Sequence, residues 1–76
     1  MPKYLYILSA EKPFIETELN RIKDEICRLF ECTDLSVSEG KVFTFQSPFG
    51  PRDVQHLAAE ASKRFRMHLT AGGKVD

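Results

Sequence analysis

A stripe of apolar residues at helical spacing is the strongest constraint on how this chain can fold. The steps between its members are four, three, four, three and one residues, along Ile15, Leu19, Ile22, Ile26, Leu29 and Phe30. This spacing predicts one buried face of a helix of about five turns. We expect Pro13 to open the helix, because proline is favoured in a first helical turn. Such a helix needs an apolar surface to cover.

Segments with a period of two residues provide that surface. Residues 3–9 are rich in aromatic and branched side chains and predict a buried strand. Residues 34–38 and 41–46 alternate on either side of Glu39-Gly40, which predicts a hairpin. Residues 65–70 alternate again and predict an edge strand, followed by a frayed tail over residues 71–76.

The segment Ser47-Pro48-Phe49-Gly50-Pro51 predicts the start of a second helix. With Gly50 as the N-cap and Pro51 as the first helical residue, Phe49 and Val54 occupy the two positions of a hydrophobic staple. A second apolar stripe then follows at Val54, Leu57, Ala58, Ala61 and Phe65. The alternative is that Phe49 is an exposed contact residue.

The order strand, helix, strand, strand, helix, strand predicts a ferredoxin-like βαββαβ fold of the α+β class. It is a two-layer sandwich in which both helices cover one face of an antiparallel sheet. A chain of 76 residues is expected to form a single domain over residues 1–76, with about 71–76 as a flexible tail. If the last strand does not form, the alternative is a βαββα sandwich with a three-stranded sheet.

Composition and charge exclude several classes of protein. The contents of 42% hydrophobic and 29% charged residues are those of an ordinary globular protein. The net charge is +0, which argues against a strongly basic nucleic-acid binder. The run from Tyr4 to Leu8 is too short for a secretion signal or a membrane span. Two cysteines, Cys27 and Cys32, do not make a disulfide framework, so we expect a cytoplasmic protein with reduced thiols.

No pattern of catalytic or metal-binding residues stands out. The histidines His56 and His68 match no zinc spacing with Cys27 and Cys32. No serine or cysteine is paired with an evident base, and no glycine-rich phosphate loop is present. We therefore expect no enzymatic activity, no cofactor and no metal.

Two stretches resemble the strand motifs of RNA recognition motifs. Leu5-Tyr6-Ile7 is similar to the start of that family's first-strand motif, and residues 41–45 are similar to its third-strand motif. The resemblance implies base stacking by Tyr6, Phe43 and Phe45 and a phosphate contact by Lys41. The alternation itself favours the opposite orientation, because Phe43 and Phe45 facing the helices make a far richer core than Val42 and Thr44 would.

The outer face of the predicted sheet has no third layer to cover it. Either Tyr4, Tyr6 and Leu8 or Leu5 and Ile7 must point toward that face. An uncovered apolar strip on a small domain is typical of an interface. We select Tyr4 and Tyr6 for this surface, since tyrosine is enriched in such patches.

A basic set near the second helix is the other candidate surface, and it could orient an acidic partner. It comprises Arg52, Lys63, Arg64, Arg66 and His68. The leading hypothesis is a protein–protein interaction module that binds a larger protein or a second copy of itself as a homodimer. It would act as a regulator or as an accessory or inhibitory factor. The alternative is a single-stranded nucleic-acid-binding domain that uses the same face of the sheet.

Overall fold

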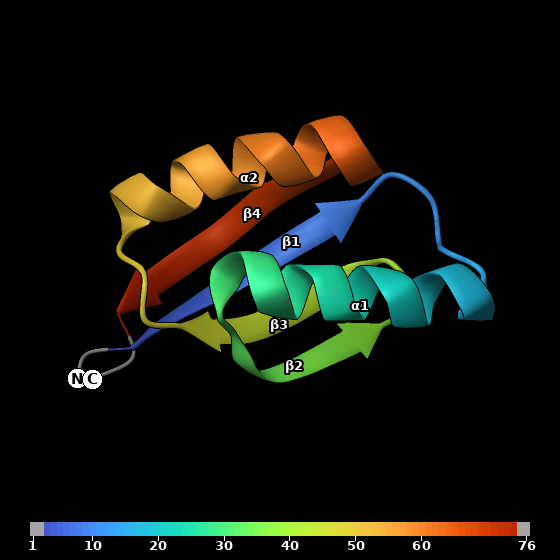
Figure 1. Cartoon of the computed structure of the whole chain (residues 1–76), viewed down its shortest axis with the longest axis horizontal. Coiled ribbons are helices and arrows are strands. Elements are labelled where there is room, and N and C mark those ends of the chain that lie inside the picture. Colours follow the sequence, from blue (N-terminus) through green and yellow to red (C-terminus); the bar gives the residue numbers. More distant parts are fainter. Residues whose placement is uncertain (1–2, 75–76) are drawn as a thin grey trace.

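The computed structural model, which describes residues 3–74, is a two-layer α+β sandwich with the predicted order of elements. The elements are β1 (Tyr4–Ala10), α1 (Glu16–Phe30), β2 (Thr33–Ser38), β3 (Val42–Ser47), α2 (Pro51–Phe65) and β4 (Met67–Lys74). The strands form one four-stranded antiparallel sheet in the order β2-β3-β1-β4. Both helices lie over the same face of this sheet and run in opposite directions (Figure 1). The ferredoxin-like prediction is therefore confirmed.

The first helix begins later than Pro13 predicts. Helix α1 starts at Glu16, and its N-cap is Ile15, whose side chain is 64% exposed rather than buried. The preceding backbone is held by the sheet, because the Phe14 N–H donates a hydrogen bond of 3.0 Å to the Gly40 carbonyl. The Phe14 ring also meets the edge of the Phe43 ring at a centroid distance of 6.0 Å. These contacts keep the connection extended until Ile15.

The predicted hairpin closes on Glu39 and Gly40. Both residues have positive φ, 56° and 68°, and the Lys41 N–H donates to the Ser38 carbonyl at 3.1 Å. Two central residues at positive φ define a type I′ turn, whose twist matches that of the two flanking strands. Glycine adopts this conformation without steric cost, which explains Gly40.

The second helix starts where the sequence predicts. Gly50 is the N-cap of α2, and Pro51 occupies its first turn. Val54 is fully buried, and Phe49 packs against the core that contains it. Phe49 and Val54, the two residues of the predicted hydrophobic staple, therefore both pack in or against the core.

The last strand begins later in the chain than predicted, and it is longer. The left-handed conformation of Arg66 (φ 57°) ends α2, so β4 begins at Met67 rather than at Phe65. The strand continues to Lys74, because residues 71–74 pair with Tyr4–Ile7 of β1. The prediction of a tail is therefore wrong for residues 71–74, and residues 75–76 lie outside the described part of the chain.

The core lies between the sheet and the two helices. Its largest fully buried side chains include Phe30, Phe43, Phe45, Ile22, Ile26, Leu8 and Met67. Phe43 and Phe45 therefore face the helices, as the alternation along β3 indicates. The Phe30 and Phe45 rings meet at a centroid distance of 5.0 Å and join α1 to the centre of the sheet.

Candidate interaction surface

The inward side of β1 is the side that carries its tyrosines. Tyr6 is 2% exposed and Leu8 is fully buried, while Tyr4 is half-buried and packs against the core. The prediction that Tyr4 and Tyr6 lie on the open face is therefore wrong. Burial of Tyr6 is possible because its hydroxyl donates a hydrogen bond of 2.8 Å to the Phe49 carbonyl.

Leu5 and Ile7 point away from the helices instead. They alternate with the buried residues of β1, and Leu5 is 38% exposed. On the same side of the sheet, residues of β3 pair with residues of β1: Gln46 with Leu5, Thr44 with Ile7, and Val42 with Ser9. We name this set of six the open face: Leu5, Ile7, Ser9, Val42, Thr44 and Gln46. Ser36 and Ser38 of β2 and His68 of β4 are exposed beside it.

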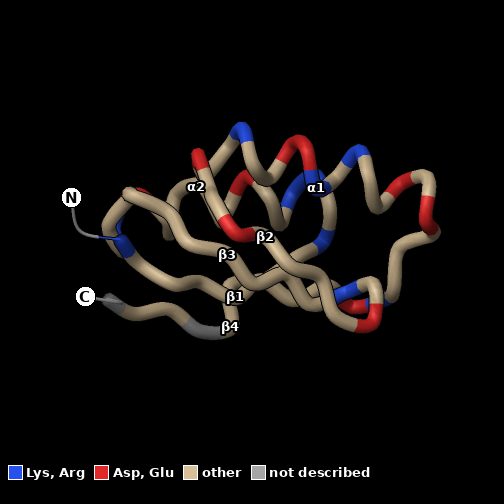
Figure 2. The backbone as a smooth tube through the Cα atoms, turned by 90° about the horizontal axis from the view of Figure 1, so that it is seen from below, with Lys and Arg blue, Asp and Glu red and all other residues tan. Residues whose placement is uncertain are grey.

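The two strands that form the open face, β1 and β3, carry no charge. Neither β1 nor β3 contains an aspartate, glutamate, lysine or arginine. The charged positions of the chain concentrate on the helices and on the turns between elements, whereas the tubes of β1 and β3 are free of them (Figure 2). The open face therefore combines three apolar side chains with uncharged polar ones.

The aromatic residues suggested for base stacking are absent from this face. Phe43 and Phe45 are 0% exposed, and Tyr6 lies beneath the helices with them. A base cannot stack on a ring that is already packed into a core, so the RNA-recognition arrangement does not exist on this sheet.

The segment 47–51 is fixed by hydrogen bonds to the rest of the fold. The buried Ser47 hydroxyl donates to the Phe30 carbonyl at 2.6 Å and accepts from the Phe49 N–H at 3.2 Å. Tyr6 binds the carbonyl of the same Phe49. Ser47 therefore ties the end of α1 to the start of α2, and Phe49 has the structural role that the staple predicts.

Phe49 also forms part of the wall of a shallow hollow between the helices. The hollow has a volume of about 430 Å³, and its lining residues are Leu29, Phe49, Asp53, His56 and Leu57. A neighbouring hollow of about 340 Å³ is lined by Glu25, Arg28, Leu29 and Arg64. Charges of both signs surround these hollows, so they do not single out a ligand of one charge.

The predicted basic residues do not form a single patch. Arg52 lies in the first turn of α2, and Lys63 and Arg64 lie in its last turn. At a rise of about 1.5 Å per residue, Arg52 is about 16 Å along the helix from Lys63. Arg66 follows α2 and lines a third hollow. The prediction that Arg52 joins the other cations is therefore wrong.

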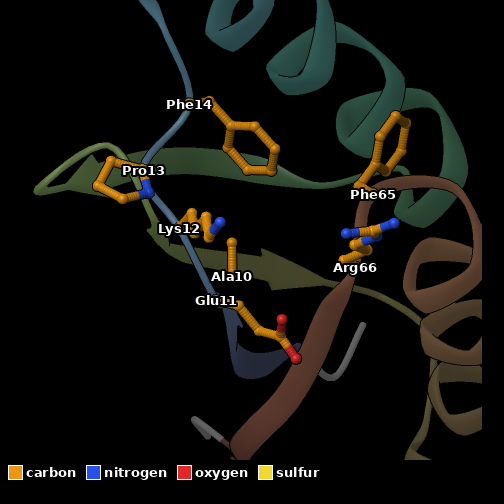
Figure 3. A pocket seen from close by; sticks show the side chains of 7 residues that line it. All are labelled: Ala10, Glu11, Lys12, Pro13, Phe14, Phe65 and Arg66. Atoms are coloured by element: carbon orange, nitrogen blue, oxygen red, sulfur yellow. The ribbon is translucent and has the colours of Figure 1, made fainter.

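The hollow beside Arg66 lies where β1 leaves the sheet and α2 ends (Figure 3). Its volume is about 120 Å³, and Phe14 and Phe65 line it together with Glu11, Lys12 and Arg66. Glu11 also lies 3.8 Å from His68 on β4. Glu11 beside Lys12 and Arg66 leaves this small hollow with one net positive charge.

The two cysteines lie at the end of α1, and both are free and half-buried. The thiol of Cys32 donates a hydrogen bond of 3.5 Å to the Cys27 sulfur. Burial, followed by this hydrogen bond, raises the pKa of Cys32 from 9.0 to about 12. Within residues 3–74, no three histidine, cysteine or acidic side chains come together in a way that could hold a metal ion.

The pKa shifts predict that the fold loses stability in alkali. Burial raises the pKa of Tyr6 above 10.0, with smaller effects from Tyr4 and Asp53, and the pKa of Cys32 rises to about 12. The unfolded chain loses these protons first, so stability is complete below about pH 9 and falls as the pH rises toward 12. We expect a loss of about 1–2 kcal/mol between pH 8 and pH 11 from Cys32, after allowance for its half-exposed position.

Urea unfolding at a series of pH values measures this loss. Cys32→Ser should show a shallower decline above pH 9 than the unmodified protein, because serine does not ionise there. A decline of equal slope in both proteins would contradict the role of Cys32.

No helix among the described residues is long and apolar enough to cross a membrane.

No protein-family model, curated protein or solved structure gives a significant match to this chain. Its class therefore follows from its own fold: it is a small ferredoxin-like α+β protein whose sheet has one uncovered side, with two central strands that carry no charge.

Proposed function

We propose that the protein is a non-enzymatic interaction module that self-associates by packing the open faces of two copies against each other. The observation that carries this proposal is the absence of charge on β1 and β3 together with the outward position of Leu5, Ile7 and Val42. An uncovered sheet face with apolar side chains is typical of an interface. We further propose a cytoplasmic location, which the free thiols of Cys27 and Cys32 support.

A second copy suits this surface because the two central strands carry no charge. In a two-fold dimer the same patch meets itself, so any charge near its centre would meet a like charge. The central strands carry none. Their serine, threonine and glutamine side chains can donate and accept hydrogen bonds, so they can pair across the two-fold axis.

The size of the face limits the strength of the dimer. The whole outer side of the sheet, with the open face at its centre, has four strands spaced by about 4.8 Å and about six residues long at about 3.3 Å each, which gives about 400 Å² per copy. A standard stable interface buries about 800 Å² per partner. We therefore expect a reversible dimer with a dissociation constant of about 10 μM or weaker. Such an equilibrium would suit a regulator or accessory factor, because a larger protein could replace one copy.

A charge placed on the open face should abolish self-association. We expect Ile7→Glu to be a monomer of 8.7 kDa, whereas the unmodified protein should approach twice that mass as its concentration rises. Ile15→Glu is the matched control, since it makes the same change at a residue that is 64% exposed on the other layer. Sedimentation equilibrium measures the masses, and thermal unfolding verifies that both variants are folded.

The salt dependence distinguishes this contact from an electrostatic one. Burial of apolar surface is not screened, so the dimer should change little between about 50 and 200 mM salt, whereas nucleic-acid binding weakens steeply over that range. A monomeric wild-type protein at millimolar concentration would contradict the proposal, as would an Ile7→Glu protein that dimerises like the Ile15→Glu control.

A further inference from the structure

The end of helix α1 brings two thiols into contact. Glu31 adopts the left-handed conformation (φ 48°), and the Cys32 N–H donates to the Cys27 carbonyl at 3.2 Å. The N–H of Glu31 binds the same carbonyl, so the last turn of α1 closes with Cys27 and Cys32 next to each other. Their sulfurs are 3.5 Å apart.

This contact joins two sulfur atoms and is not part of a metal-binding cluster among the described residues. Both thiols are free, and no cluster of three metal-binding side chains occurs among the described residues. The sulfurs need to approach by about 1.5 Å to reach the disulfide distance of about 2.05 Å. The backbone hydrogen bond between Cys32 and Cys27 already holds the two residues side by side.

We infer that Cys27 and Cys32 form a redox modification site that closes to an intramolecular disulfide by exchange with a small disulfide such as oxidised glutathione. Cys27 accepts the hydrogen bond from the Cys32 thiol, which assigns the first attack to the Cys27 sulfur. The Cys27 thiolate attacks one sulfur of glutathione disulfide. That S–S bond breaks, and one glutathione leaves as its thiol after it gains a proton.

The second step uses Cys32. It loses its proton to solvent and attacks the Cys27 sulfur of the mixed disulfide, and the second glutathione leaves. In total two protein thiols are oxidised, and one glutathione disulfide is reduced to two thiols. The pKa of Cys32 is raised first by burial and then by its hydrogen bond to Cys27 and the charge of Cys27. Once the Cys27 sulfur is bound to glutathione, neither the hydrogen bond to Cys27 nor its charge raises the pKa of Cys32 any longer.

Mass spectrometry of the full chain in glutathione buffers tests the inference. The reduced protein is equilibrated at a series of ratios of reduced to oxidised glutathione and quenched with acid. We expect a monomer lighter by two hydrogen atoms that carries no glutathione. Its equilibrium constant should be about tenfold higher in the folded protein than in guanidinium chloride, because the fold holds the thiols in contact. Accumulation of mixed disulfide, covalent dimers, or equal closure in denaturant would overturn the inference.

Single-cysteine variants test the order of attack. Cys32→Ser should retain one glutathione on Cys27, because no second thiol remains to displace it. Cys27→Ser should acquire glutathione on Cys32 about tenfold more slowly, since burial, the first cause of the raised pKa of Cys32, remains and keeps this thiol protonated. Equal rates in the two variants would overturn the assignment of Cys27 as the attacking residue. The site lies on the helical layer, so these results do not depend on dimer formation at the open face.

Discussion

Replacement of Tyr6 by alanine is expected to lower the free energy of unfolding by about 3–5 kcal/mol, the usual cost of deleting a buried aromatic ring. Tyr6 is 2% exposed, its ring meets that of Phe45 at 6.1 Å, and its hydroxyl binds the Phe49 carbonyl. Leu5→Ala, at the adjacent position on the other side of β1, should cost less than about 1 kcal/mol in the monomer. Because small domains have little stability to lose, Tyr6→Ala is expected to be largely unfolded at 37 °C.

Urea unfolding followed by circular dichroism compares the two variants. Tyr6→Phe serves as an intermediate case that keeps the ring but loses the hydrogen bond to Phe49, for an expected loss of about 1–2 kcal/mol. A greater loss in Leu5→Ala than in Tyr6→Ala would show that β1 presents its other side to the helices.

Replacement of Gly72 by alanine is expected to cost about 1–3 kcal/mol, because the new methyl group would overlap the Tyr6 ring. A Cβ atom at Gly72 would lie 2.5 Å from Cδ1 and 2.9 Å from Cε1 of Tyr6. The ring cannot move aside, because its hydroxyl is bound to Phe49 and its plane stacks on Tyr4 at 6.2 Å. Glycine at this position therefore accommodates the aromatic residue opposite it on the neighbouring strand.

Gly73 provides the matched control for this prediction. It is the next residue of β4, and a Cβ atom there would have no neighbour within 4 Å. Gly73→Ala should leave the midpoint of thermal unfolding unchanged or slightly higher, whereas Gly72→Ala should lower it by several degrees. Equal midpoints in the two variants would place the Tyr6 ring elsewhere.

The local pattern of residues was sufficient to predict the fold. The spacing from Ile15 to Phe30 predicts the buried face of α1, which holds from Leu19 onward but not at the exposed Ile15, and Gly50-Pro51 predicts the start of α2. The alternation along β3 predicts that Phe43 and Phe45 are buried. These features depend on residues within one or two turns of each other, so their chemistry can be read without knowledge of the partner elements.

The candidate surface could not be predicted in the same way, because β1 is apolar on both of its sides. Leu5 and Ile7 are as suited to a core as Tyr6 and Leu8, so the alternation gives two possible orientations and no preference between them. The distance from Arg52 to the cations at the other end of α2, by contrast, follows from the sequence, because Arg52 and Lys63 lie in one predicted helix that rises by about 1.5 Å per residue. The orientation of β1 therefore depends on contacts across the fold, whereas the error on Arg52 lies within one helix.

Residues close together in the chain determined the elements of this protein and their order, because periodicity, capping and turn chemistry act over a few residues. The tertiary structure alone decided which side of β1 is open and which residues meet. Tyr6 faces inward because Gly72 leaves room for its ring and Phe49 offers a carbonyl to its hydroxyl, and these two residues lie far from it in the sequence. Cross-strand pairing and packing join such distant residues, and they thereby leave Leu5 and Ile7 at the open face.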